Sequence, residues 1–199
     1  GNVFADSTVL NNNGTTNSSE LILASGKNIT STITTADANM GILTLAGGTQ
    51  IVTGQVGTNG NKLAEVNAGV AGSSTTFVND VYATNLDVEG TGTVNLDGNF
   101  TGTAIRYNAD GKVELADTKN IDSAITTATN NTGTLTLEGS STVIGQVGAS
   151  GASLKEINAG VSGTTSTFVN DVYASNLNIT GTGTVVLNSD LTGNVVTTG

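Results

Sequence analysis

Two pairs of acidic residues are the best candidates for chemistry in this sequence: Asp80 with Glu65, and Asp171 with Glu156. Paired carboxylates in a surface groove are the catalytic groups of polysaccharide lyases and hydrolases. The simpler interpretation is structural, because an Asn-Asp pair such as Asn79-Asp80 favours a corner between strands, where the carboxylate caps backbone NH groups. The chain has no His, no Cys and a single Arg, so most general bases and anion-binding groups are missing. We therefore predict no catalytic residues and no enzymatic activity, and keep a carbohydrate-active protein as the alternative.

The stretch RYNADGKVELAD, from Arg106 to Asp117, resembles a calcium-binding loop. Its Asn108, Asp110, Gly111 and Asp117 fall on ligand and glycine positions of such a loop. However, the first ligand position is the arginine, and the last is Asp where such loops have Glu. We therefore predict an Asp-Gly turn between two strands, and no metal site or cofactor.

Two other polar patterns receive no functional role. A regular array of Thr-x-Thr triplets could bind ice, but these triplets recur too irregularly, and Thr suits the outer face of a strand. Asn-x-Ser/Thr sequons are expected by chance in a chain so rich in Asn and Thr. The triplets are Thr91/Thr93, Thr101/Thr103, Thr134/Thr136 and Thr182/Thr184, and the sequons begin at Asn28, Asn99 and Asn178.

Charge and composition limit the possible partners. Six Lys or Arg against sixteen Asp or Glu give a net charge of −10, and the basic residues are scattered. Nucleic acid and anionic membranes attract basic patches, so neither is an expected partner. No apolar run approaches the ~18 residues of a membrane span, so we expect no membrane insertion of this segment. The absence of Cys removes disulfides and thiolate zinc sites.

The acidic candidates belong to a long internal repeat. FVNDVYATNL, residues 77–86, returns as FVNDVYASNL, residues 168–177, and matching phrases flank both copies. Between the copies, apolar residues are kept at alternate positions while the residues between them vary, which is the pattern of short half-buried strands. We predict that Phe77, Val81 and Leu86 point inward, with Asn79-Asp80 at the corner.

Strand positions recur about every 22 residues, at Leu43, Val66 and Val88, which suits one three-strand coil of a solenoid. The interior residues are mostly Val, Ile, Leu, Ala and Thr, and Pro is absent, as long backbone ladders require. We predict an all-β, right-handed parallel β-helix of about 8–9 coils. It would form a single rod over residues 1–199, built from repeats at about 10–102 and 103–193. The alternative is two tandem β-sandwich domains.

Several phrases together resemble the passenger region of rickettsial outer-membrane autotransporters of the outer membrane protein B and surface cell antigen type. These phrases are NTGTLTLEGSSTVIGQVG, LKEINAGV, FVNDVYASNL and GTGTVVLNSDLTG. The resemblance implies a β-helical passenger that is exported through a C-terminal barrel and displayed outside the cell, so that this chain would be a fragment. Such passengers coat the surface, adhere to host cells or resist host defence. No functional residue carries over.

The expected partners follow from this resemblance and from the rod itself. A displayed passenger would meet a receptor on the host-cell surface. The end coils of a solenoid expose unpaired strand edges, which favours self-association, either laterally or end to end. The expected location is extracellular, on the bacterial surface.

Overall fold

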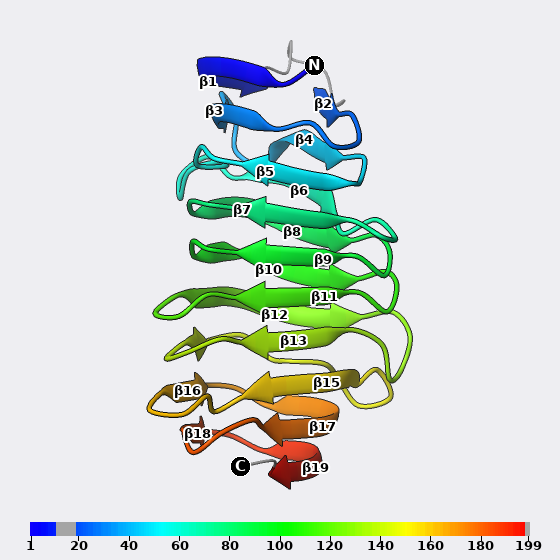
Figure 1. The fold of residues 1–199 in the computed structure, drawn as a ribbon, viewed down its shortest axis with the longest axis vertical. Coiled ribbons are helices and arrows are strands. Elements are labelled where there is room, and N and C mark those ends of the chain that lie inside the picture. The colour runs from blue at the N-terminus through cyan, green and yellow to red at the C-terminus, as the bar shows by residue number, and fades with distance from the viewer. Residues whose placement is uncertain (11–18, 198–199) are drawn as a thin grey trace.

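The computed structural model describes residues 1–10 and 19–197, which form nineteen β-strands and no helix (Figure 1). The strands are β1 (Val3–Leu10), β2 (Glu20–Leu23), β3 (Ile29–Thr35), β4 (Met40–Leu45), β5 (Thr49–Val52), β6 (Leu63–Ala68), β7 (Ser74–Phe77), β8 (Val81–Val88), β9 (Thr93–Leu96), β10 (Phe100–Tyr107), β11 (Lys112–Leu115), β12 (Asn120–Thr127), β13 (Thr134–Leu137), β14 (Thr142–Val143), β15 (Leu154–Ala159), β16 (Thr165–Phe168), β17 (Val172–Ile179), β18 (Thr184–Leu187) and β19 (Leu191–Thr197).

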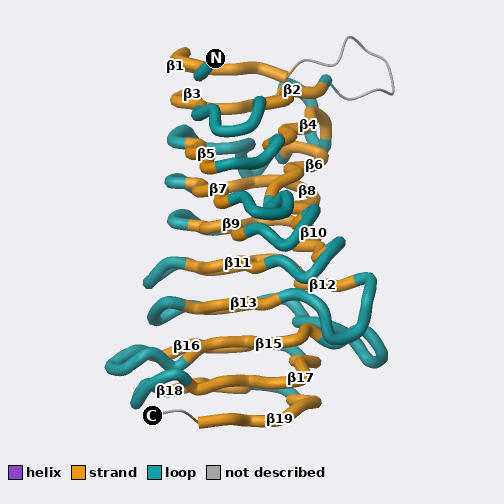
Figure 2. Tube along the Cα trace, turned by 45° about the vertical axis from the view of Figure 1, so that its right-hand side comes forward, coloured by secondary structure: helices purple, strands orange, loops and turns teal. Residues whose placement is uncertain are grey.

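The strands form two long parallel sheets that wind around one core. Odd-numbered strands make a ten-stranded sheet and even-numbered strands a nine-stranded sheet. Each strand pairs with the strand two places along the chain, so the backbone climbs as a solenoid of about nine coils (Figures 1 and 2). The predicted parallel β-helix is confirmed. The alternative of two sandwich domains is wrong, because both sheets run without interruption through the junction of the two repeats.

Long strands bend, so that each coil has three sides, and several side chains of each coil point inward. In β8 the alternation of buried and outward residues breaks at Thr84-Asn85, two consecutive outward residues, and the strand continues around a corner. Inward side chains of successive coils then stack in ladders of paired residues, and three of these ladders run along most of the rod. The first ladder is Ile29, Val52, Phe77, Leu96, Leu115 and Leu137. The second is Ile33, Val56, Val81, Phe100, Ile121, Val143, Phe168 and Leu187. The third is Leu43, Val66, Leu86, Ile105, Ile125, Val147, Val172 and Leu191.

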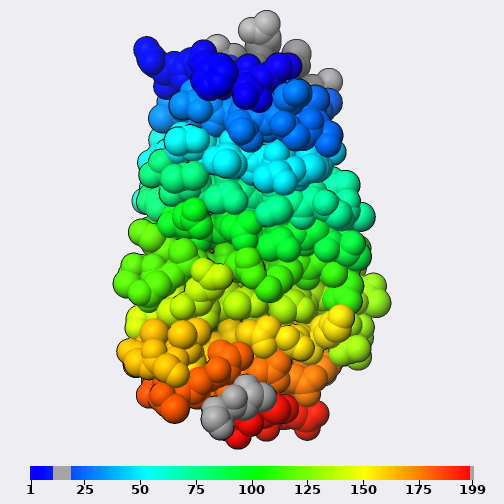
Figure 3. Space-filling model, in the orientation of Figure 1, coloured from blue at the N-terminus to red at the C-terminus, as the bar shows by residue number. Residues whose placement is uncertain are grey.

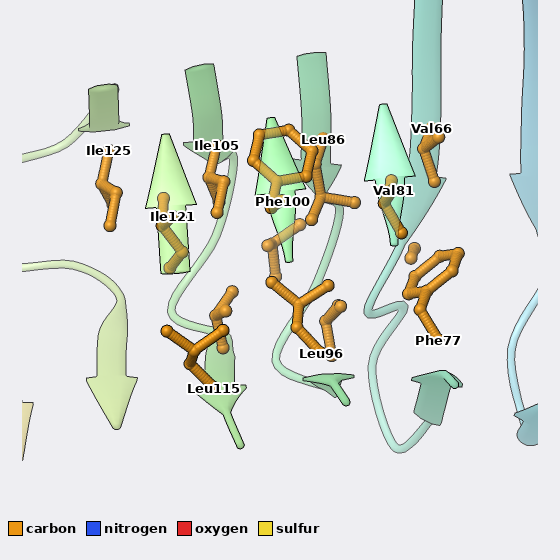
Figure 4. Close-up of a cluster of buried hydrophobic side chains, with 14 of the residues drawn as sticks. Val66, Phe77, Val81, Leu86, Leu96, Phe100, Ile105, Leu115, Ile121 and Ile125 are labelled. Atoms are coloured by element: carbon orange, nitrogen blue, oxygen red, sulfur yellow. The ribbon is translucent and has the colours of Figure 1, made fainter. Parts of the chain in front are cut away.

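These ladders, together with further inward pairs such as Leu63 with Ala83 and Ala68 with Val88, form the hydrophobic core, part of which is seen in Figure 4. Phe77, Val81 and Leu86 are at most 1% exposed, as predicted. One predicted register is wrong: Val66 stacks on Leu86, whereas Val88 stacks on Ala68. Coils differ in length, and the residue that stacks on Val66 is only twenty residues further along the chain. A fixed interval of 22 residues therefore reaches Val88, the next inward residue after Leu86.

The two sequence copies are rotated relative to each other around the rod. Phe77 lies in the first ladder, but its equivalent Phe168 lies in the second. In the same way Val81 lies in the second ladder and its equivalent Val172 in the third. One repeat contains nine strands, an odd number, so each strand from β2 to β10 has its equivalent in the other sheet. One repeat therefore spans four coils plus one face.

Candidate functional site

Asp80, the first acidic candidate, caps the backbone of the next coil. It lies in the turn between β7 and β8, where its Oδ1 accepts hydrogen bonds from the backbone N of Asn99 at 2.8 Å and from Asn99 Nδ2 at 3.1 Å. On the opposite side of the same corner, Asn79 Nδ2 donates to the carbonyl of Thr53 at 2.6 Å. Asn79-Asp80 thus connects three successive coils, as the corner interpretation predicts.

The second copy builds the same corner. Asp171 Oδ1 accepts from the backbone N of Asp190 at 3.3 Å and from the hydroxyl of Ser189. Asn170 Nδ2 donates to the carbonyl of Ile144 at 2.6 Å, as Asn79 does in the first copy. The repeated block is therefore a structural device that is used twice.

The corner continues as a row of side chains along the rod. Asn99, which Asp80 caps, accepts through Oδ1 from the backbone N of Asn120 at 2.9 Å. Asn120 Oδ1 in turn accepts from the backbone N of Thr142 at 3.1 Å. A similar bond joins Asn28 Oδ1 to the backbone N of Ile51 at 2.9 Å. Two of the sequon residues, Asn28 and Asn99, thus have a structural role in the folded rod.

Glu65 does not share a site with Asp80. The Cα of Glu65, on β6, pairs with that of Asn85, which is five residues along β8 from Asp80. The bend at Thr84-Asn85 lies between these two positions, and Glu65 Oε2 lies 3.2 Å from Arg106 Nη2, whereas Asp80 accepts from Asn99. In the second copy, Glu156 accepts a hydrogen bond from Asn158 Nδ2 at 2.7 Å. The acidic candidates are thus held by separate partners.

A charged cluster on the outer face was not predicted from the sequence. Arg106 on β10 pairs with Asp87 on β8, and both Nε and Nη2 of the guanidinium donate to its carboxylate. Arg106 Nη2 also lies 3.2 Å from Glu65 Oε2. The Asp87 side chain is only 3% exposed, whereas that of Arg106 is 39% exposed. Hydrogen bonding to Asp87 raises the pKa of Arg106 above its ordinary value. The ion pairs of this cluster connect three successive coils. The only sign of the pair in the sequence is the spacing of nineteen residues between Asp87 and Arg106, which is close to the length of one coil.

The calcium-loop residues do not converge. Residues 108–111 form the predicted turn between β10 and β11. Asp110 Oδ2 lies 2.6 Å from Lys155 Nζ, and that hydrogen bond lowers the pKa of Asp110. Asp117 Oδ1 accepts from the backbone N of Ser140 at 2.6 Å, and Asn108 Nδ2 donates to Glu89 at 3.1 Å. Nowhere in residues 1–10 and 19–197 do three acidic side chains group as metal ligands.

The Thr-x-Thr triplets form no continuous array. Thr93, Lys112 and Thr134 are paired in succession on β9, β11 and β13. Lys112 and Glu114 occupy the outward positions of β11 and form an ion pair at 2.5 Å. The Thr rows are therefore interrupted in the middle of the rod.

No pocket is found on the described part of the chain. On the face drawn in Figure 3, side chains of successive coils cover the rod closely. Within the described residues, no helix is long and apolar enough to cross a membrane. Comparison of the chain with protein families, with curated proteins and with solved structures gives no match. Any proposal about function therefore depends on the residues of the chain itself.

Proposed function

We propose that this chain is a non-enzymatic structural and adhesive segment, displayed at the bacterial surface as part of an autotransporter passenger. The observation that carries the proposal is the use of the polar outer residues. The carboxylates and amides at the corners bond the backbone of neighbouring coils, as Asp80 does with Asn99 and Asp171 with Asp190. These polar groups stabilise the stacking of the coils, and they do not converge in a binding cleft. Recognition by this surface would involve an extended face and not a single cleft.

The surface location is supported by the composition and by the resemblance of the repeated phrases to rickettsial autotransporter passengers. A chain with a net charge of −10, without Cys, and built as a stiff parallel ladder suits exposure outside the cell. Antibodies raised against the chain should label intact bacteria that carry the gene. Labelling that requires permeabilised cells would place the protein inside and contradict the proposal.

Adhesion can be measured with coated beads. Beads that carry the chain should bind cultured animal cells more than beads that carry serum albumin, an acidic protein of unrelated fold. An excess of the free chain should compete for this binding. Equal binding of both bead types would contradict the adhesive role.

The same preparation should leave acidic polysaccharides intact. If it cleaves them, and an Asp80→Asn, Asp171→Asn double variant does not, the carbohydrate-active alternative replaces the proposal.

A further inference from the structure

The loop between β5 and β6 carries an exposed Asn-Gly pair at the tip of a turn. The turn begins at Thr58 and ends at Asn61, and Asn59 and Gly60 between them are both exposed. The backbone N of Thr58 donates to the carbonyl of Asn61 at 3.0 Å, and the backbone N of Asn61 donates to Thr58 Oγ1 at 3.0 Å. These bonds hold the two flanks of the turn and involve neither residue of its tip.

The base of the turn is anchored to the preceding coil. Asn61 Nδ2 donates to the carbonyl of Thr35 at 3.3 Å and to that of Ala36 at 3.0 Å. The carbonyl of Lys62 accepts from the backbone N of Asn39 at 2.8 Å. Because the base is fixed in this way, the tip stays exposed while the rod is folded.

The two groups that can react in an Asn-Gly pair are both free at this tip. Among the residues that the structure describes, neither the side-chain amide of Asn59 nor the backbone N of Gly60 has a hydrogen-bond partner. A Cβ placed on Gly60 would meet nothing within 4 Å, so the space around the tip is open. Gly60 itself has no Cβ to shield its backbone N, and its backbone can adopt the angles that bring this N to the Asn59 side chain.

We propose that Asn59 is a site of spontaneous deamidation, with the backbone of Gly60 and a water molecule as the reactants. The backbone N of Gly60 loses its proton to hydroxide and bonds to Cγ of Asn59, while the bond from Cγ to Nδ2 breaks and ammonia leaves. Water then opens the cyclic imide at either carbonyl, which gives aspartate or isoaspartate at position 59. Either product adds one negative charge to the −10 of the chain, and isoaspartate also lengthens the backbone of the turn by one carbon.

The Asp110-Gly111 pair shows how the fold protects a similar sequence. The carboxylate of Asp110 accepts from the backbone N of Gly133 at 3.1 Å and lies 2.6 Å from Lys155 Nζ, a contact that lowers the pKa of Asp110. The backbone N of Gly111 donates to the carbonyl of Ala109 at 2.8 Å. Both reacting groups are therefore engaged, and an ionised carboxylate resists attack by a nucleophile. We expect no isoaspartate at Asp110 in the folded chain.

Packing or residue type removes two further candidates. Gly98, which follows Asp97, is buried against the corner, where an added Cβ would lie 2.3 Å from the backbone C of Asn79. In the second copy, the residues equivalent to Asn59 and Gly60 are Ser150 and Gly151, and a serine hydroxyl cannot form an imide. Deamidation would thus make the two copies differ at this turn.

Trypsin separates Asn59 from Asn13-Gly14, the other Asn-Gly pair of the sequence, which lies outside the described residues. Cleavage after Lys27 and Lys62 places Asn13 in peptide 1–27 and Asn59 in peptide 28–62. After incubation of the folded chain, mass spectrometry should show peptide 28–62 with an acid in place of the amide of Asn59. Its isoaspartate form should accept a methyl group from protein L-isoaspartyl methyltransferase. Because Gly60 must lose a proton, the rate should rise from neutral to mildly alkaline pH.

Two variants test the route of the reaction. Gly60→Ala should keep the wild-type urea midpoint, because its Cβ meets nothing, and should deamidate at least about tenfold more slowly. Ser150→Asn transfers the Asn-Gly pair to the exposed turn of the second copy, and peptide 120–155 should then deamidate as well. A Gly60→Ala chain that reacts as fast as wild type would contradict the imide route.

The chain unfolded in guanidinium chloride provides the reference for the effect of the fold. Asn59 should react in both the folded and the unfolded chain, whereas Asp110 should form isoaspartate only in the unfolded chain. An Asn59 that stays intact in the folded chain while it reacts in the unfolded chain would overturn the proposal, since the tip of the turn would then be protected.

Discussion

Arg106 and Asp87 lie opposite each other on neighbouring coils, and the guanidinium of Arg106 donates two hydrogen bonds to the buried carboxylate of Asp87. Replacing Arg106 by Val leaves that carboxylate without its counter-ion. Loss of one partner of a buried pair costs about 3–5 kcal/mol. Arg106 is 39% exposed, and water therefore screens part of the interaction. We expect Arg106→Val to lower the free energy of unfolding by about 1–2 kcal/mol, measured by urea titration.

The second copy supplies the matched control. The positions equivalent to Asp87 and Arg106 are Asn178 and Val196, so the rod accepts a neutral pair there. The double variant Asp87→Asn, Arg106→Val should recover most of the stability lost in Arg106→Val. Equal destabilisation of the single and double variants would show that packing of the Arg106 side chain, and not its charge, is responsible.

Tyr107 should make the rod sensitive to alkali. Its ring is buried, and its hydroxyl donates to the carbonyl of Thr134 at 2.6 Å. Burial raises the pKa of Tyr107 well above its ordinary value of 10.0. The folded state therefore keeps the proton while the unfolded chain releases it above about pH 10, so this contribution to stability is complete below pH 10 and is lost as the pH rises further.

The urea midpoint at pH 8 and at pH 11 measures this effect. Above the ordinary pKa, each pH unit costs about 1.4 kcal/mol for one such group. Tyr107→Phe should be less stable than wild type at pH 8 by about 1–2 kcal/mol, because the Thr134 carbonyl loses its donor. The variant should lose less stability than wild type between pH 8 and pH 11. Identical pH profiles would show that Tyr107 does not carry the alkaline sensitivity.

Asp80 should protect one amide in particular. Its carboxylate accepts from the backbone N of Asn99, so Asp80→Ala should speed hydrogen exchange at Asn99 and destabilise the rod by about 1 kcal/mol. Asp80→Asn keeps an acceptor oxygen and should have a smaller effect. Amide exchange followed by NMR distinguishes the two variants. Unchanged exchange at Asn99 in Asp80→Ala would show that the cap is dispensable.

Close packing of the coils should forbid a side chain at Gly54. A Cβ at this position would lie 1.8 Å from the carbonyl oxygen of Ser31, and its equivalent Gly145 meets Ser123 at 2.1 Å. Backbone must move to accept Gly54→Ala, so we expect a loss of about 3 kcal/mol or more, seen as a lower urea midpoint or a loss of soluble protein. Gly60→Ala is the control, since a Cβ there meets nothing within 4 Å. Similar stability of the two variants would contradict this account.

The fold could be predicted because its signals are local and repeated. Alternating apolar residues define strands, and the near-identical blocks 77–86 and 168–177 locate the corner that Asn79 and Asp80 build. The exact stacking could not be predicted, because the distance along the chain between bonded coils varies. Asp87 and Arg106 are separated by nineteen residues, but Thr53 and Asn79 by twenty-six. A fixed period cannot follow such variation, and the error at Val88 came from this source.

The charged cluster illustrates the same limit. In the calcium-loop pattern, Arg106 stands at the first ligand position, where a cation is out of place. Its actual partner lies one coil away, on a neighbour that only the register of β8 and β10 identifies. The second copy also has Val196 at the position equivalent to Arg106. A comparison of the two copies therefore does not indicate a conserved charged pair.

Because the two copies are rotated relative to each other, equivalent surface residues of successive repeats face different sides of the rod. The corners of Asp80 and Asp171 face different sides, and a longer rod of this repeat would return a feature to the same side only after three repeats. That corresponds to about thirteen coils, or about 62 Å at 4.8 Å per coil. A flat partner would thus meet identical epitopes at long, regular intervals. Two rods lying side by side could not match identical rows over neighbouring repeats, which disfavours their zippering into sheets.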